Sequence, residues 1–270
     1  MGFYNLLAVL IRAQIGPVVV YQSPLLLNAG ICHGFSTRLG GISPRPFDCM
    51  NLGNPNGCDV QDDTRRIEEN YQRLSEAIGG KGREILRVHQ VHGAAVAKVR
   101  RGKAFEVHQK ADAMVSDDPT RFVSVRVADC VPVLLACEDG SLVAAIHAGW
   151  RGVIARVIPA ALDVMNVERG RLIAAIGPCI GVEAFEVGPE VVAAFVESFG
   201  QEAPVRRRED GKGHVDLRRA IARQLLAEGV AADRIDLSER CTFRDREEFF
   251  SHRRDNGITG RMAALIAAAE

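Results

Sequence analysis

One apolar run decides the fold, and it reads VPVLLACEDGSLVAAIH at residues 131–147. Its two halves, Val131–Cys137 and Leu142–His147, are strand-like and flank the pair Asp139-Gly140. An Asp-Gly pair between two apolar runs is the strongest short-range signal for a β-hairpin. We therefore predict an antiparallel hairpin over this run.

The predicted hairpin places Cys130 near His147. If the hairpin closes symmetrically about its turn, Pro132 faces His147, and Cys130 lies diagonally across the ladder on the same face. Such diagonal neighbours are about 7 to 8 Å apart at Cα, a gap that one metal ion or one hydrogen bond can bridge. A single buried cysteine or histidine usually only packs in the core, so the prediction of a site depends on the pair and on the adjacent Asp129.

Two further histidines, His89 and His92, follow a predicted strand over Ile85–Val91. Positions three apart on a strand face opposite sides, so at most one of them joins Cys130 and His147, and the pattern leaves open which. Two histidines and a thiolate would hold zinc with a fourth position free for water, whose pKa falls there to about 7. Without a metal, Cys130 as nucleophile and His147 as base would make a hydrolase or transferase.

The remaining periodic segments predict a mixed α and β fold in one domain, since no linker divides the chain. Helices are expected from Asp63, from Pro189 and after the cap Asp216, each ending near a glycine. Further strands are expected at Phe122–Val127 and Leu172–Ile176.

Composition narrows the class of protein. The 270 residues carry 34 basic and 34 acidic side chains, so no basic field favours nucleic acid. Seven cysteines without CxxC spacing argue against a disulfide framework and predict a reducing, cytoplasmic compartment. The apolar stretch Leu6–Ile11 is too short to cross a membrane, and we predict a loose N-terminal extension there.

The C-terminal region gathers cations and hydroxyls in Phe249–Asp255 and in Thr259-Gly260-Arg261. Such a group suits a phosphate or another anion, although a solvated basic turn explains it equally well.

Eight motifs of the chain, taken in order, resemble those of the YfiH-like family, also called the multicopper polyphenol oxidoreductase (laccase) family. They are His33–Gly41, Asn51-Leu52-Gly53, Gln90-Val91-His92-Gly93, Asp112-Ala113-Met114-Val115, Ala128–Pro132, His147–Gly152, Ile176–Ile180 and Phe249–Asp255. The resemblance begins near residue 25. It divides the chain into an N-terminal extension, 1–24, and a single catalytic domain, 25–270.

The resemblance implies a metal site and a fold. The implied metal ligands are His92, Cys130 and His147. The implied fold is an α+β single domain with two mixed β-sheets between helices, a four-layer α/β/β/α arrangement. A bacterial toxin deamidase shares this arrangement and has a catalytic Cys-His pair, which keeps the cysteine-hydrolase alternative open.

The resemblance also implies activities: phosphorolysis of adenosine, inosine and methylthioadenosine, deamination of adenosine, an older assignment as a copper phenol oxidase, and editing of peptidoglycan precursors. The partners would be a nucleoside and phosphate, with no nucleic acid and no membrane. From side-chain chemistry we expect Asp129 to move a proton beside Cys130 and His147. The residues expected to hold phosphate are Arg38, Arg254 and Arg261, and those expected to orient the nucleoside are Asn51 and Gln90.

The oxidase alternative is weaker on physical grounds, because one cluster of two histidines and a cysteine cannot hold the several copper ions that reduction of oxygen to water requires. Zinc is the predicted metal, with copper as an alternative occupant because it outcompetes zinc at most nitrogen and sulfur sites. A binding or assembly factor without chemistry of its own is a further alternative. The open fourth position and the arginines favour an enzyme.

Overall fold

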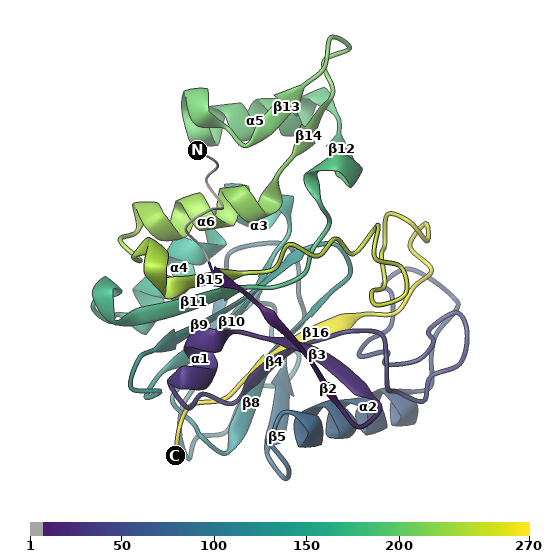
Figure 1. Ribbon diagram of the computed structural model, residues 1–270, viewed down its shortest axis with the longest axis vertical. Helices are drawn as coiled ribbons and strands as arrows, with labels where there is room; N and C mark the ends of the chain where they lie inside the picture. The colour runs from purple at the N-terminus through teal and green to yellow at the C-terminus, as the bar shows by residue number, and fades with distance from the viewer. Residues whose placement is uncertain (1–7) are drawn as a thin grey trace.

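The computed structural model describes residues 8–270, which form two large β-sheets and one small sheet (Figure 1). The seven-stranded sheet has the order β1 (Ala8–Val9), β15 (Ile235–Leu237), β11 (Leu172–Ile176), β9 (Val131–Cys137), β10 (Val143–Ala148), β7 (Ala113–Ser116), β6 (Val96–Val99). The six-stranded sheet has the order β2 (Ile11–Ile15), β3 (Val18–Gln22), β4 (His33–Ser36), β16 (Met262–Ile266), β8 (Arg121–Val127), β5 (Glu84–Arg87). The small sheet, which we did not predict, has the order β12 (Glu186–Val187), β14 (Gly213–Val215), β13 (Val205–Arg207).

Six α-helices accompany the sheets in the described part of the chain. They are α1 (Pro24–Asn28), α2 (Thr64–Ala77), α3 (Trp150–Ile154), α4 (Val157–Met165), α5 (Pro189–Phe199) and α6 (Leu217–Ala227). The helices predicted from Asp63, Pro189 and Asp216 are confirmed as α2, α5 and α6. The Asp63 side chain accepts the Arg65 N–H and that of Asp216 accepts the Arg219 N–H, as capping requires.

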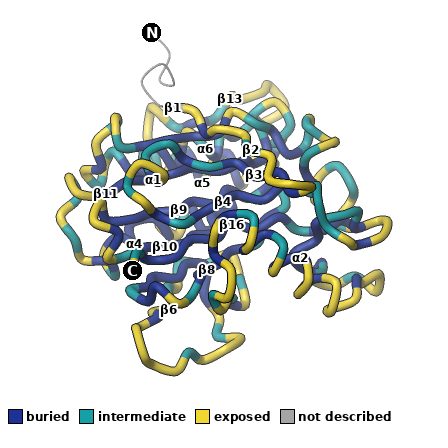
Figure 2. Tube along the Cα trace, turned by 60° about the horizontal axis from the view of Figure 1, so that its bottom comes forward, coloured by how far each residue is buried: buried dark blue, intermediate teal, exposed yellow. Residues whose placement is uncertain are grey.

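Three apolar clusters hold four layers together. Between the two large sheets, Leu134 and Ala145 of one pack against Val125 and Ala264 of the other. Helices α4 and α6 cover the outer face of the seven-stranded sheet, and α2 covers that of the six-stranded sheet (Figure 1). Figure 2 shows the strands of both sheets buried inside this stack. The predicted four-layer α+β single domain is confirmed, and burial of each large apolar side chain stabilises it by about 1.5 to 3 kcal/mol.

The central hairpin has the predicted register. Strands β9 and β10 pair antiparallel with His147 opposite Pro132, and the Gly140 N–H donates to the Cys137 carbonyl in the turn. Both strands are buried along their whole length, because β11 and β7 flank them and the other sheet lies against one face. The hairpin is therefore the rigid centre of the seven-stranded sheet.

Two expectations are wrong. The N-terminal extension predicted over residues 1–24 is wrong from residue 8 onward: β1 pairs with β15, and β2 and β3 extend the six-stranded sheet beyond β4. The apolar side chains of Val18 and Val20 are buried against α2, so this segment is part of the core, while residues 1–7 lie outside the described part. The strand predicted over Ile85–Val91 ends at Arg87, because the chain turns away from β8 there.

None of the helices in the described part is both long and apolar enough to span a bilayer. All seven cysteines carry free thiols.

A buried histidine makes stability depend on pH. His33 is fully buried; its Nε2 accepts the Ser23 N–H, and burial lowers its pKa to about 4. The unfolded chain takes up a proton near pH 6.5 and the folded chain does not, so the free energy of unfolding falls as the pH drops from about 6.5 to 4. At 1.36 kcal/mol per pKa unit the loss is about 3 kcal/mol.

Urea unfolding of the wild type and of His33→Gln at pH 7.5 and pH 5 tests this dependence. The variant is expected to be less stable at both pH values but to lose less stability between them. The surface variant His108→Asn should follow the wild type. An equal loss in His33→Gln and wild type would contradict the prediction.

Candidate active site

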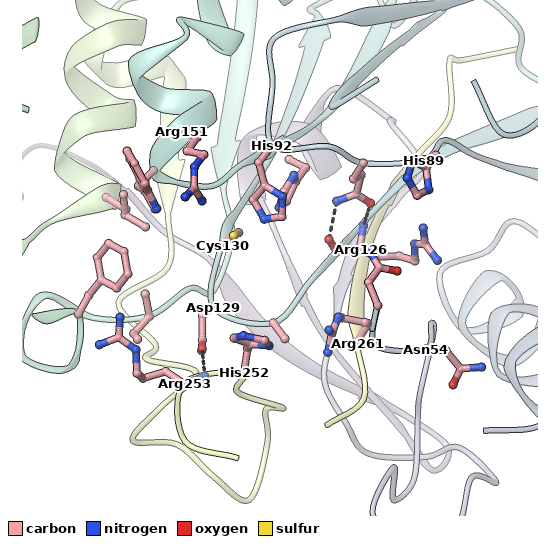
Figure 3. Close-up of a pocket in the computed structure, with 18 residues that line it drawn as sticks. Asn54, His89, His92, Arg126, Asp129, Cys130, Arg151, His252, Arg253 and Arg261 are labelled. Carbon is pink, nitrogen blue, oxygen red and sulfur yellow. Dashed lines mark hydrogen bonds between the residues drawn. The ribbon is translucent and has the colours of Figure 1, made fainter. Parts of the chain in front are cut away.

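A cavity of about 390 Å³ opens where the central hairpin ends and where the loops after β5 and β8 meet the loop before β16. Figure 3 shows Cys130 and His92 near its centre, with Arg151 on one side and His89, Arg126 and Arg261 on the other. Ligand sites are commonly concave and partly apolar, with a few converging polar groups, and this cavity has that character.

Three side chains come together inside the cavity. One ligand atom each of His92, Cys130 and His147 lie within 4.8 Å of one another. The two imidazole rings meet edge to face, with centroids 4.8 Å apart. His147 is buried, Cys130 is half-buried and His92 is exposed, so the group is open on the side of His92.

Each of the three comes from a different local structure. His147 lies on β10, and Cys130 directly precedes β9, so the hairpin register brings them together. His92 lies in a loop with a φ of 61°, a left-handed conformation that turns its ring toward the pair. A Cβ at Gly149 would lie 2.9 Å from His92 Cδ2 and 3.0 Å from Cys130 Sγ. Only glycine leaves room for both side chains here.

The prediction that His89 and His92 face opposite sides of one strand needs correction. His89 and His92 are not on a regular strand, and both line the same cavity, although only His92 belongs to the three-residue group. His89 instead forms an isolated bridge with Lys110.

Asp112 organises two members of the group, and we did not predict this role. Its carboxylate is fully buried; Oδ1 lies 2.8 Å from His147 Nδ1 and accepts the His92 N–H at 2.9 Å. Oδ2 accepts the N–H groups of Gly93 at 2.7 Å and Val91 at 3.2 Å. One carboxylate thus orients the His147 ring, leaving Nε2 for the cavity, and holds the His92 loop in its left-handed turn.

The electrostatics favour a thiolate. Burial raises the pKa of Cys130, but the charge of His147 and hydrogen bonds from His147 and His92 outweigh it, so the pKa falls to about 6. Burial lowers the pKa of His147, and its interactions with Cys130 and Asp112 reverse this and raise it to about 9. The pKa of Asp112 is lowered, because the hydrogen bond from His147 and those from backbone N–H groups exceed the effect of burial. A thiolate facing two imidazoles is a donor set that zinc prefers, and the residues fit a three-ligand metal site.

Asp129 lies beside Cys130 with a φ of 89°. Its Oδ1 accepts the Thr242 hydroxyl at 2.6 Å, and its Oδ2 accepts the Arg253 N–H at 2.7 Å. Both oxygens therefore hold the loops of the cavity wall, and a part for Asp129 in proton transfer stays a prediction.

Of the five predicted substrate-binding residues, only Gln90 and Arg261 line the cavity. Arg38 instead donates to the Asp48 carbonyl, forms an ion pair with the Asp48 side chain and stacks on Phe250. Asn51 is fully buried.

Arg254 is also placed away from the cavity. It pairs with Asp255 and donates to the carbonyls of Thr242 and Phe249. Arg38, Asn51 and Arg254 thus lie outside the lining of the cavity, where their polar groups join loops, and their contact with substrate stays a prediction without support from this geometry.

Several cavity residues were not predicted from the sequence. Arg126 was counted within a predicted strand, and Arg253 within a basic run in which Arg254 was chosen. Trp150 and Phe185 form an aromatic wall; Arg151 lies 4.3 Å over Trp150 and Arg253 lies 5.4 Å over Phe185. Alternation along β8 would have placed Arg126 on the opposite face from Val125 and Val127.

Comparisons with known proteins agree with the fold and the motifs. The family model described as multi-copper polyphenol oxidoreductase laccase matches residues 32–269. Purine nucleoside phosphorylase YfiH of Shigella flexneri is 38% identical over 249 residues, which cover 92% of this chain and 98% of that protein. The purine nucleoside phosphorylase of Deinococcus radiodurans is 36% identical over 242 residues, 88% of this chain and 90% of its own.

A solved structure has the same fold as this chain. YlmD from Geobacillus stearothermophilus matches with a TM-score of 0.83 at 32% identity, covering 96% of this chain and 98% of that chain. The match includes nearly all of both chains, so it extends to the single-domain fold and not only to the hairpin. This chain therefore belongs to the multi-copper polyphenol oxidoreductase laccase family, and it resembles members of that family that are named purine nucleoside phosphorylases.

Proposed function

We propose that this protein is a zinc-dependent purine nucleoside phosphorylase that acts on adenosine, inosine and methylthioadenosine. The observation that carries the proposal is the open group of His92, Cys130 and His147 inside a cavity that is lined by aromatic side chains and by four arginines. The names of the relatives support the same reaction.

The cavity wall suits a purine nucleoside. Trp150, Phe185 and Ile180 offer flat and apolar surfaces to a purine ring, and Arg151 and Arg253 already stack on the two aromatic rings. Aromatic side chains bind planar heterocycles through stacking and burial of apolar area. We infer that the base lies on this side and that the ribose points toward Cys130.

The reaction is a group transfer. An oxygen of phosphate forms a bond to the ribose C1′, the C1′–N9 bond breaks, and its electron pair leaves with the purine, which takes up a proton. The products are the free base and ribose 1-phosphate, or the 5-methylthio derivative of ribose 1-phosphate when methylthioadenosine is the substrate. The residues of this chain bind and orient both substrates, so that the phosphate oxygen is held close to C1′.

The metal would be held by His92 and His147 through imidazole nitrogens and by Cys130 through its thiolate. When bound, zinc supplies a Lewis acid that stabilises developing negative charge. Within residues 8–270 only this one group has ligand atoms placed to hold a metal ion. That supports zinc over the several copper ions of a phenol oxidase, with copper as a possible occupant.

A cysteine-histidine hydrolase is the second candidate. The observation that favours it is the thiolate character of Cys130 beside a charged His147 oriented by Asp112, since this arrangement activates a nucleophile even without a metal. Adenosine deamination is proposed as a further activity of the same cavity.

Product analysis separates these reactions. Protein without an affinity tag is analysed for metal, stripped with a chelator, reloaded with zinc or copper, and incubated with adenosine with and without phosphate. Adenine with ribose 1-phosphate, formed only with phosphate and metal, is the expected result. Inosine alone would show deamination. Absence of both products from the zinc-loaded protein would overturn the proposed function and favour the hydrolase.

A further inference from the structure

We propose that Arg126 and Arg261 form the subsite for inorganic phosphate, and that the segment Asn51-Leu52-Gly53 builds this subsite. The proposal rests on the proposed function and assigns one of its two substrates to a place in the cavity. Both arginines line the cavity, and Figure 3 shows them on the side of Cys130 away from Arg151 and Arg253, the two residues that stack on Trp150 and Phe185.

The backbone of Arg261 is fixed by hydrogen bonds to the segment Asn51-Leu52-Gly53. Its N–H donates to Asn51 Oδ1 at 2.9 Å, and its carbonyl accepts the Leu52 N–H at 2.9 Å. Its Nη1 donates to the carbonyls of Thr259 and Gly260, which fixes the direction of the side chain. Figure 3 shows the guanidinium directed into the cavity.

Arg126 is held by a different set of contacts. Gln90 accepts the Arg126 N–H and donates to the Arg126 carbonyl, both at 2.8 Å, so its amide is already engaged in fixing this part of β8. The guanidinium of Arg126 passes over Gly53. A Cβ at Gly53 would lie 2.8 Å from Arg126 Cδ and 3.2 Å from Arg126 Nη1, so glycine leaves the space in which this side chain lies.

Asn51 links the contacts that fix Arg261 to those that fix Arg126. Its Oδ1 accepts both the Arg261 N–H and the Gly53 N–H, and its Nδ2 donates to Asp62 at 3.0 Å. One buried amide thus sets the position of the Arg261 backbone and of the glycine beneath Arg126.

In the described part of the chain neither of the two arginines is paired directly with a carboxylate, although the charges of Cys130 and Asp129 act on Arg261 from a distance. Both Arg126 and Arg261 are half-buried. Burial lowers the pKa of Arg261, and the charge of Arg126 lowers it further, so the two charges lie close enough to repel. Two neighbouring guanidinium groups removed from water are costly unless an anion joins them.

The surroundings select the anion. Among residues 8–270 the one acidic side chain that lines the cavity is Asp129, and both of its oxygens already accept hydrogen bonds. Arginine is well matched to phosphate, because its planar fork can donate two parallel hydrogen bonds to one group. Arg151 and Arg253 are less suited, since both are exposed and stack on the aromatic wall.

Steady-state kinetics with the zinc-loaded protein test the assignment. In Arg126→Ala and in Arg261→Ala we expect the KM for inorganic phosphate to rise about 10-fold to 100-fold, the loss typical of a hydrogen bond to a charged group. The KM for adenosine should change less than twofold. Arg73→Ala removes an exposed arginine of α2 and should match the wild type.

A second variant covers the case in which an alanine variant does not fold. In Gly53→Ala the new methyl group displaces the Arg126 side chain, but the side chain keeps its positive charge. We expect the same selective rise in the KM for phosphate, smaller than that in Arg126→Ala. Unchanged phosphate KM in the folded variants, or a rise in the adenosine KM alone, would overturn the subsite.

Direct binding of inorganic phosphate, measured by titration calorimetry, separates this proposal from the proposed function. If the wild type binds phosphate, Arg126→Ala does not, and no adenine forms, the subsite stands and the phosphorylase assignment fails. If adenine forms but both proteins bind phosphate equally, the phosphorylase assignment stands and the subsite is wrong. If the wild type binds no phosphate, the subsite is wrong as well.

Discussion

Replacing Cys130 by serine is expected to reduce zinc from about one ion per chain to a small fraction and to lower phosphorolysis about 10³-fold. A serine hydroxyl is a poor zinc ligand at neutral pH, and the two histidines alone hold the ion weakly. Stabilisation of charge by a metal is worth several kcal/mol, and each 1.36 kcal/mol corresponds to a factor of ten in rate. Elemental analysis of the purified variant and initial rates with saturating substrates measure both effects.

Cys32→Ser is the matched control. Cys32 is also half-buried, but its thiol lies 3.0 Å from the Ile78 carbonyl, a contact that a serine hydroxyl can make, and it is outside the cavity. It should keep both zinc and activity. A Cys130→Ser variant that keeps zinc and loses activity would favour the cysteine nucleophile, whereas one that keeps both would contradict a role for Cys130.

Replacing Asp112 by asparagine is expected to weaken zinc binding about 10-fold to 100-fold, as is typical of residues that orient metal ligands. Asparagine has the same shape but offers one acceptor oxygen where Asp112 uses two. Either the His147 ring or the N–H groups of the His92 loop then face an amide donor. Competition for zinc with a chromogenic chelator measures the affinity.

Weaker zinc binding in Asp112→Asn could follow from a loss of stability, and the variant Asp118→Asn is the control for that effect. Asp118 is another buried aspartate that accepts backbone and side-chain hydrogen bonds, but it lies outside the cavity. This variant should lower the temperature of unfolding without changing the zinc affinity. If Asp112→Asn and Asp118→Asn unfold at similar temperatures and bind zinc equally well, Asp112 does not position the ligands.

The elements predicted from sequence are those whose signals are local. The hairpin register followed from Asp139-Gly140 and from the two-residue period of a strand, and α2 followed from the spacing of its apolar residues and the glycine pair after it. The N-terminal strands were missed because residues 8–22 are stabilised by partners as distant as β15. Their short apolar runs carry no such information.

The candidate site divides in the same way. The sequence by itself determined that Cys130 and His147 are neighbours, because two residues of one hairpin are related by register alone. Family motifs added His92. Only the tertiary structure decided that Asp112 orients both histidines, that Arg126 and Arg261 share one side of the cavity, and that Arg38, Asn51 and Arg254 hold loops together. These contacts join segments far apart in the chain, and a polar side chain has no sequence signal that tells whether it faces a substrate or a backbone carbonyl.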